Sequence, residues 1–186
     1  MSRIAFVQRF LAGRVLDVGY AVGPLHSEIE QSRDVIAIDT VVKAPEKKIL
    51  KADALALPFK DHSFDSVLAG ELIEHLDRPA LFLRESRRVL RKGGSLVITT
   101  PNRKSLVNRL FRAYEKPAHL TLFSRQELFS LLEAEGFSLR EWTLFPYTEE
   151  SSEGSRHRWF YPVRKAMHLF LPRPLQEQLA VVGSAV

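Results

Sequence analysis

The stretch VLDVGYAVG, residues 15–23, decides the fold of this 186-residue chain. Four residues of strand type, one of them an aspartate, run into a turn with a small residue at every second position, and Pro24 follows. Small residues let the backbone approach a ligand closely, and proline suits the first helical position because its missing N–H would be unpaired there. The pattern therefore predicts a strand, a ligand-binding turn and a helix in succession.

The rest of the chain continues this alternation of strand and helix. Helices are predicted at Pro79–Arg91, which Lys92, Gly93 and Gly94 follow, and at Ser124–Glu135, where Ser124 and Glu127 form a capping box. Short apolar runs typical of strands buried on both faces occur at Val15–Val18, Val35–Ile38, Ile49–Leu50, Ser66–Ala69 and Leu96–Thr99. A long strand is predicted at Phe137–Tyr147 and a last one at Leu179–Val182. This order predicts an α/β fold with a doubly wound, mostly parallel sheet that binds ligands at the carboxyl ends of its strands.

Composition narrows the class of protein. With 45% hydrophobic and 26% charged residues, the chain suits a single soluble domain spanning residues 1–186. No run of 18 apolar residues exists, and arginines interrupt the apolar N-terminus, so we expect a cytoplasmic protein without a membrane span or signal peptide. The absence of cysteine excludes disulfides, a thiol nucleophile and zinc–cysteine sites, and no His, Asp or Glu set has metal spacing, so no metal is expected. The net charge of +5 fits a nucleic acid, an anionic lipid or an acidic metabolite as partner.

The acidic residues around the turn favour one class of cofactor. Asp39 follows Gly19 by 20 residues, at the end of the second predicted strand, where a carboxylate can bind both ribose hydroxyls. Asp17 precedes Gly19 by two residues, and the small residues Gly19, Ala21 and Gly23 do not follow the dinucleotide pattern. A carboxylate there disfavours the pyrophosphate of NAD but attracts the ammonium and sulfonium of S-adenosylmethionine (SAM). The turn thus favours SAM over NAD.

Six segments, in chain order, resemble class I SAM-dependent methyltransferases: VLDVGYAVG, AIDT, ADALALPF, FDSVLAGELIEHLDRP, RRVLRKGGSLVITTPN and HLTLFSRQEL. Within that superfamily the chain is similar to the broad type 11 group, which includes ubiquinone- and menaquinone-pathway O- and C-methyltransferases. The resemblance covers about residues 13–147 and departs at Ala21, where the family usually has glycine. It implies a Rossmann-like, seven-stranded sheet with an antiparallel last strand, SAM as methyl donor and S-adenosylhomocysteine as product.

The resemblance also implies a cofactor site at the strand ends. Asp17 would lie near the methionine ammonium, Asp39 would hold the ribose, and Asp53 would accept from the adenine amino group. A turn-capping role for Asp53 and solvent exposure for Glu71 are the alternatives. The implied set is Asp17, Gly19, Tyr20, Ala21, Gly23, Asp39, Thr40, Asp53, Ala54, Leu55, Gly70 and Glu71.

Two histidines are the candidates for a general base. His75 follows the fourth predicted strand and His119 follows the fifth, and histidine can take a proton from a phenol or an alcohol near neutral pH. A bracing hydrogen bond is the alternative for each, and Glu74 is expected to be structural. The other histidines are expected at the surface or as caps: His26, His62, His157 and His168.

Three functions are compatible with these patterns. The first is SAM-dependent methyl transfer to an O, N or C nucleophile of a small molecule, lipid-like or aromatic. The second is RNA methylation, which is supported only by the basic charge and by the basic and aromatic residues of Asn102–Pro117. The third is a non-catalytic SAM-fold binding partner. The sequence does not select the acceptor atom, the pathway or the oligomeric state.

The segment 148–176 is expected as an insertion between the last two strands. Pro162 can start a helix, and the residues after it place an apolar stripe on one helical face, namely Val163, Ala166, Met167 and Phe170. The run 156–173 holds five Arg or Lys residues and no acid. Only about 13 residues precede the first strand, so cover for the substrate is expected from this insertion or from Asn102–Pro117. The insertion either packs on the core or forms a lid or interfacial helix in peripheral contact with an anionic membrane.

Overall fold

A computed structural model describes residues 1–19, 24–31, 33–42, 48–106, 109, 120–146, 162–163, 166, 172 and 175–186. These residues build a seven-stranded sheet in the order β3-β2-β1-β4-β5-β7-β6, in which only the pairings of β7 are antiparallel. The strands are β1 Arg14–Val18, β2 Asp34–Asp39, β3 Ile49–Lys51, β4 Phe64–Gly70, β5 Leu90–Pro101, β6 Phe137–Phe145 and β7 Gln178–Ala185. The predicted α/β fold, with its mostly parallel sheet and antiparallel last strand, is confirmed.

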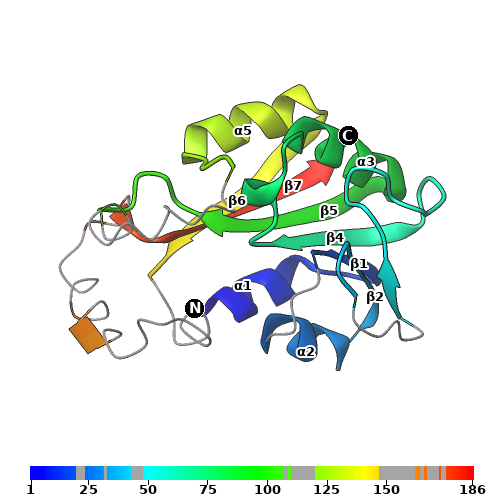
Figure 1. Cartoon of the computed structure of the whole chain (residues 1–186), viewed down its shortest axis with the longest axis horizontal. Coiled ribbons are helices and arrows are strands. Elements are labelled where there is room, and N and C mark those ends of the chain that lie inside the picture. The colour runs from blue at the N-terminus through cyan, green and yellow to red at the C-terminus, as the bar shows by residue number, and fades with distance from the viewer. Residues whose placement is uncertain are drawn as a thin grey trace.

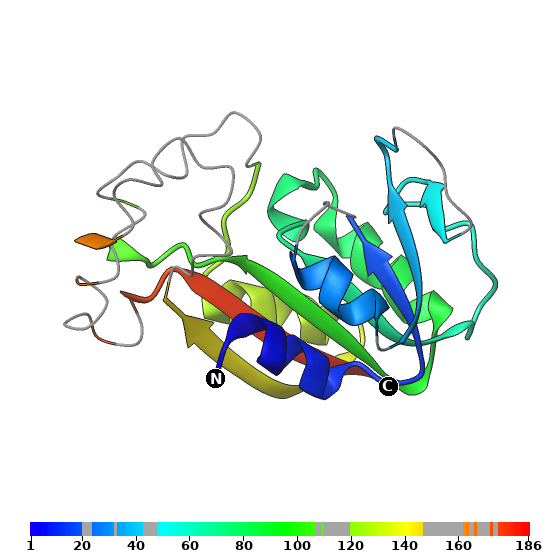
Figure 2. The same ribbon diagram turned by 90° about the horizontal axis from the view of Figure 1, so that it is seen from below.

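Helices cover both faces of the sheet. Figure 1 shows α1 (Arg3–Phe10) and α2 (Pro24–Glu30) on one face, and α3 (Pro79–Val89) and α5 (Arg125–Ala134) on the other. Figure 2 shows α1 running alongside the long strands β5, β6 and β7. None of the described helices is long and apolar enough to cross a bilayer.

Each face of the sheet has its own apolar core. Phe82 of α3 and Leu128 of α5 belong to one cluster, and Phe6 of α1 and Ile29 of α2 belong to the other, all of them fully buried. In β1 the residues after Arg14 are all buried, so this strand contributes to both clusters. Burial on both faces explains why β1 reads as a nearly continuous apolar run rather than as an alternating one.

The predicted capping box of α5 is confirmed. The Glu127 N–H donates to Ser124 Oγ at 3.4 Å, and the Ser124 N–H donates to the Glu127 carboxylate at 2.8 Å. Gly136, with φ of +80°, follows the last turn, in the left-handed conformation that glycine adopts without steric cost.

The predicted end of α3 is wrong by two residues. The helix ends at Val89, and Leu90 is already extended and pairs with Phe64 of β4. The basic residues and glycines that follow belong to β5, and Gly93 has its positive φ of +75° within that strand. The local pattern favours a helix that continues to Arg91, but Leu90 instead pairs with β4 as a buried strand residue.

The N-terminal residues form a helix that the sequence did not indicate. Ser2 caps α1 by accepting from the Ala5 N–H at 3.1 Å, and Phe6 and Val7 are buried against the sheet. The arginines that interrupt the apolar pattern have partners of their own. Arg3 is buried with a guanidinium nitrogen 3.8 Å from Glu71.

Little of the predicted insertion belongs to the described part of the chain. Pro162, Val163 and Ala166 have helical backbone and are exposed, and Val163 exposes 46% of its surface. Met167 and Phe170 lie outside the described residues, as do most residues of Asn102–Pro117. The stripe members that are described therefore do not pack on the core.

Candidate active site

The sheet reverses its winding direction between β1 and β4. From β1 the chain proceeds outward to β2 and β3, whereas β4 lies on the opposite side of β1 and leads on to β5. Such a switch point leaves a crevice outside the carboxyl ends of the two strands. Val18 pairs with Ala69 in parallel register, so Gly19 and Gly70 leave the sheet at the same edge.

Gly19 is required by the geometry of the turn that it opens. Its φ is +80°, its N–H donates to the Ile38 carbonyl at 2.9 Å, and an added Cβ would lie 2.9 Å from Cδ1 of Leu72. The turn after β1 thus approaches the segment after β4 closely. The other predicted turn residues, Tyr20, Ala21 and Gly23, lie outside the described residues.

We expect Gly19→Ala to weaken the binding of S-adenosylhomocysteine by about tenfold or more, because a displaced turn misplaces its ligand contacts. Gly93→Ala is the matched control. Gly93 also has a positive φ, of +75°, but an added Cβ meets nothing within 4 Å. Both variants should lose about 1–2 kcal/mol of unfolding free energy in urea titrations, since each strains one left-handed residue. Only Gly19→Ala should lose affinity in calorimetry, and equal affinities for the two variants would contradict the assignment.

Asp39 and Asp53 each organise the turn that follows a strand. Asp39 Oδ1 accepts from the Val41 N–H at 2.8 Å and from the Thr40 hydroxyl at 3.4 Å. Asp53 Oδ1 accepts from the Leu55 N–H at 2.8 Å, so its turn-capping role is observed. Oδ2 of both aspartates has no hydrogen bond to another described residue, which leaves it available for a ligand hydroxyl or amine.

We expect Asp39→Ala to weaken S-adenosylhomocysteine binding by about 10- to 100-fold, because hydrogen bonds to a charged group contribute roughly 1.5–3 kcal/mol. Asp39→Asn retains an oxygen for the Val41 N–H and should lose less. Asp34→Ala removes an exposed carboxylate from the opposite end of the same strand and serves as the control. Unchanged calorimetric affinity in Asp39→Ala would remove Asp39 from the site.

Asp17 has a partner that the sequence did not reveal. Its carboxylate Oδ2 lies 2.6 Å from Nδ1 of His26 in a buried hydrogen bond, and His26 Nε2 lies 3.7 Å from Glu30. The expectation that His26 is a surface or capping residue is therefore wrong. Because α2 folds back along β1, the third residue of the helix covers the strand-end carboxylate. Contact of Asp17 with the ammonium of a cofactor stays a prediction.

The segment after β4 brings two glutamates and a histidine to the edge of the crevice. Glu71 has a φ of +53° and donates its N–H to the Thr99 carbonyl at 2.8 Å, which turns the chain into the short helix η1 (Ile73–His75). Left-handed backbone in a non-glycine residue is uncommon and concentrates at functional sites. His75 is 36% exposed, and its Nε2 lies 4.0 Å from Glu74 Oε1.

Glu74 is the most buried acid of this segment, with 1% of its surface exposed. The Thr100 hydroxyl donates to Oε2 at 2.9 Å, and the backbone carbonyl accepts from the N–H groups of Leu120 and Thr121. The structural role expected for Glu74 is thus observed. Burial, and after it the nearby Glu71 carboxylate, raise the pKa of the Glu74 carboxyl to about 8. His119, the chain neighbour of Leu120, lies outside the described residues.

The other histidine expectations divide in the same way. His62 is exposed, with Nδ1 2.9 Å from the Leu90 carbonyl, so its surface position is confirmed. His157 and His168 lie outside the described residues.

The charge of the site matches a cationic ligand. Carboxylates stand at or next to the ends of three neighbouring strands, from Asp39, from Asp17, which His26 also contacts, and from Glu71, which Arg3 approaches. Gly19 supplies a turn in which an added Cβ would lie 2.9 Å from Leu72. Acids attract a sulfonium and an ammonium, whereas they repel a pyrophosphate. These residues therefore fit SAM. Within the described ranges, no group of His, Asp or Glu is arranged to hold a metal ion.

Comparison with known proteins agrees with this site. A family model described as a methyltransferase domain matches residues 2–141. A Mycobacterium tuberculosis protein named "probable S-adenosylmethionine-dependent methyltransferase" is 37% identical over 57% of this chain. The demethylmenaquinone methyltransferase of Renibacterium salmoninarum is 33% identical over 46% of it. The matched stretches make up 41% and 40% of these two relatives.

A solved structure extends the likeness in fold to nearly the whole chain. The S-adenosylmethionine-dependent methyltransferase of Mesorhizobium loti superposes with a TM-score of 0.71 at 17% identity, covering 97% of this chain and 95% of that one. The family match spans most of the chain, and the topology and the acidic strand ends agree with it. The chain therefore belongs to the class I SAM-dependent methyltransferase family, and SAM is its cofactor.

Proposed function

We propose that this protein transfers the methyl group of SAM to an O, N or C nucleophile of a small, lipid-like or aromatic molecule. The observation that carries the proposal is the switch point between β1 and β4, where acidic residues stand at the strand ends and the partly exposed His75 follows β4. The acceptor named by the demethylmenaquinone relative has this aromatic and lipid-like character.

The residues of the chain have separate tasks in this reaction. Bound SAM supplies the methyl carbon and a sulfonium leaving group, so the protein mainly orients the reactants for in-line attack. Asp39 and Asp53 hold the nucleoside, and Gly19 admits the amino-acid portion against the backbone. The imidazole of His75 accepts the proton that a hydroxyl or amine loses on methylation. Glu74 stays protonated near neutral pH and braces the loop that carries His75.

Labelled SAM offers a direct test. The protein is incubated with it and with either a metabolite extract or total RNA, and the labelled products are analysed by mass spectrometry. We expect a labelled product in the metabolite extract, and Asp39→Ala should reduce the amount of labelled product formed. Label confined to RNA would instead establish RNA methylation. Binding of SAM without any labelled product would identify a non-catalytic SAM-binding partner.

We also propose a cytoplasmic location with peripheral contact to anionic membranes. The exposure of Val163 on helical backbone and the acid-free basic run 156–173 support this contact. Flotation with anionic vesicles should recover the protein at low salt, and recovery should fall with added salt and in Trp159→Ala. No flotation at low salt would leave segment 148–176 as a lid or core element and favour a water-soluble acceptor.

A further inference from the structure

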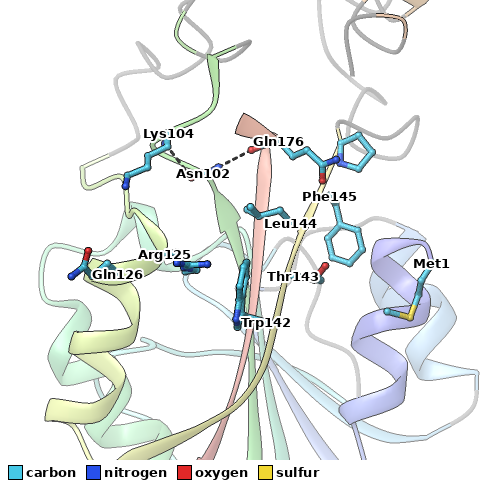
Figure 3. Close-up of a pocket in the computed structure, with 11 residues that line it drawn as sticks. Met1, Asn102, Lys104, Arg125, Gln126, Trp142, Thr143, Leu144, Phe145 and Gln176 are labelled. Atoms are coloured by element: carbon cyan, nitrogen blue, oxygen red, sulfur yellow. Dashed lines mark hydrogen bonds between the residues drawn. The ribbon is translucent and has the colours of Figure 1, made fainter. Parts of the chain in front are cut away.

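A cavity opens at the carboxyl end of β6. It has a volume of about 590 Å³, within the range of small-molecule sites. Figure 3 shows that its lining comes from both faces of the sheet. Arg125, Trp142 and Leu144 lie on the α5 side, whereas Phe145 lies on the side of α1.

The charges on this lining are of one sign. Lys104 and Arg125 line the cavity, and none of the lining residues among the described positions is a carboxylate. The neighbouring cation Arg103 is neutralised by an ion pair with Glu127. Lys104 and Arg125 have no such ion pair within the part of the chain that the structure describes. Within the described residues, the cavity thus keeps two positive charges that no carboxylate balances.

Aromatic surface lies directly beside these charges. The Arg125 guanidinium stacks 4.3 Å from the centre of the Trp142 ring, and Trp142 packs edge-on against Phe129 with ring centres 6.1 Å apart. Trp142 nevertheless exposes 38% of its surface, and Leu144 beside it is only partly buried. A ligand here meets an apolar wall and two cations at once, which suits an anionic group on an apolar or aromatic body.

The position of the cavity relates it to the cofactor crevice. β6 runs parallel to β5, because β7 is antiparallel to both, so the cavity and the crevice open at the same edge of the sheet. β6 lies three strand spacings from β4, a separation of about 14 Å. One molecule that occupies both places must therefore be elongated.

We propose that this cavity binds the anionic end of an elongated, apolar methyl acceptor, whose methylated atom lies in the crevice roughly 10–15 Å away. The proposal rests on the proposed function, since it assigns one end of the acceptor of that reaction. The recognised group is a carboxylate, phosphate or sulfonate that is bound by Arg125 and Lys104, with the adjoining apolar body on Trp142 and Leu144.

Two dyes of matched shape test the chemistry of the cavity. The anion 8-anilinonaphthalene-1-sulfonate and its uncharged analogue N-phenyl-1-naphthylamine differ only in the sulfonate. They are titrated into a Trp159→Phe background, in which Trp142 is the sole tryptophan and its quenching reports binding of the dye. The double variant Lys104→Gln/Arg125→Gln should bind the anion at least about tenfold more weakly. Its affinity for the neutral dye should change less than about twofold.

Controls separate this proposal from general effects and from the proposed function. Lys92→Gln removes an exposed cation of β5 at the opposite end of the sheet and should leave both affinities unchanged. Calorimetry with S-adenosylhomocysteine should give equal affinities for all variants, and a protein that fails to bind it would overturn the proposed function without bearing on the dye result. Equal losses for both dyes, an unchanged affinity for the anion, or no quenching of Trp142 would each overturn the anion site.

Discussion

Replacement of His75 by asparagine is expected to slow methyl transfer by about 10²- to 10⁴-fold, the usual contribution of a general base. Asparagine retains a polar side chain of similar size but cannot take a proton near neutral pH. His75 is half-exposed at the end of η1, so the variant should fold normally, and S-adenosylhomocysteine binding should stay within about twofold of wild type. Single-turnover rates across pH measure the effect, and the variant should lose the inflection that the base produces in the wild-type profile.

His62→Asn is the matched control for this experiment. His62 lies beside Leu90, at the end of the sheet opposite the crevice, and asparagine tolerates its positive φ of 55°. Its turnover should equal that of wild type. Wild-type turnover in His75→Asn would shift the role to His119. If the double variant with His119→Asn also kept full turnover, the acceptor would need no histidine base, which would favour an anionic or carbon nucleophile.

The free energy of unfolding of the cofactor-free protein is expected to fall by several kcal/mol between pH 5 and pH 8, and Glu74→Gln should remove most of that fall. The pKa of Glu74 rises from its ordinary value of 4.5 to about 8 on folding, chiefly through burial. The folded state therefore holds this proton more tightly than the unfolded state. The corresponding stability is complete below pH 4.5 and is lost as the pH rises through 8, at up to about 1.4 kcal/mol per pH unit.

Urea titrations at pH 5, 6.5 and 8 measure this change. Glu71→Gln should make the loss of unfolding free energy between pH 5 and pH 8 smaller, because the Glu71 carboxylate is the second cause of the raised pKa of Glu74. Glu133→Gln, on the exposed face of α5, should leave the wild-type profile unchanged. Ion pairs hold the pKa of Glu85 and Glu135 below the usual range, so their stability is lost only at acid pH, outside this window. Parallel profiles for wild type and Glu74→Gln would contradict the assignment.

The sequence by itself determined the elements whose signals are local. Residues 15–23 predicted a strand and a turn, and β1 and the left-handed Gly19 confirm the strand and the start of the turn. The capping box at Ser124 set the start of α5, because its two hydrogen bonds lie within one helical turn. Burial on both faces marked the central strands, such as β1 and β4, as apolar runs, and these with the helices between them sufficed for the fold class.

Only the tertiary structure decided which residues share an environment. His26 lies in a polar stretch of sequence that is typical of the surface, yet α2 buries it against Asp17. Arg3 interrupts an apolar pattern, yet it is buried in α1 with a guanidinium nitrogen 3.8 Å from Glu71, far along the chain. The end of α3 moved to Val89 for a similar reason, since a strand partner for Leu90 outweighs the local signal of a helix terminus.

The cavity at the end of β6 shows the same limit most clearly. Lys104, Arg125 and Trp142 come from three separate elements or their ends, and no spacing in the sequence joins them. They meet because β7 inserts between β5 and β6 and brings the two carboxyl ends to one edge. Local hydrogen bonding and burial are encoded in neighbouring residues, whereas a site built across strands depends on their order, which the packing of the whole sheet determines.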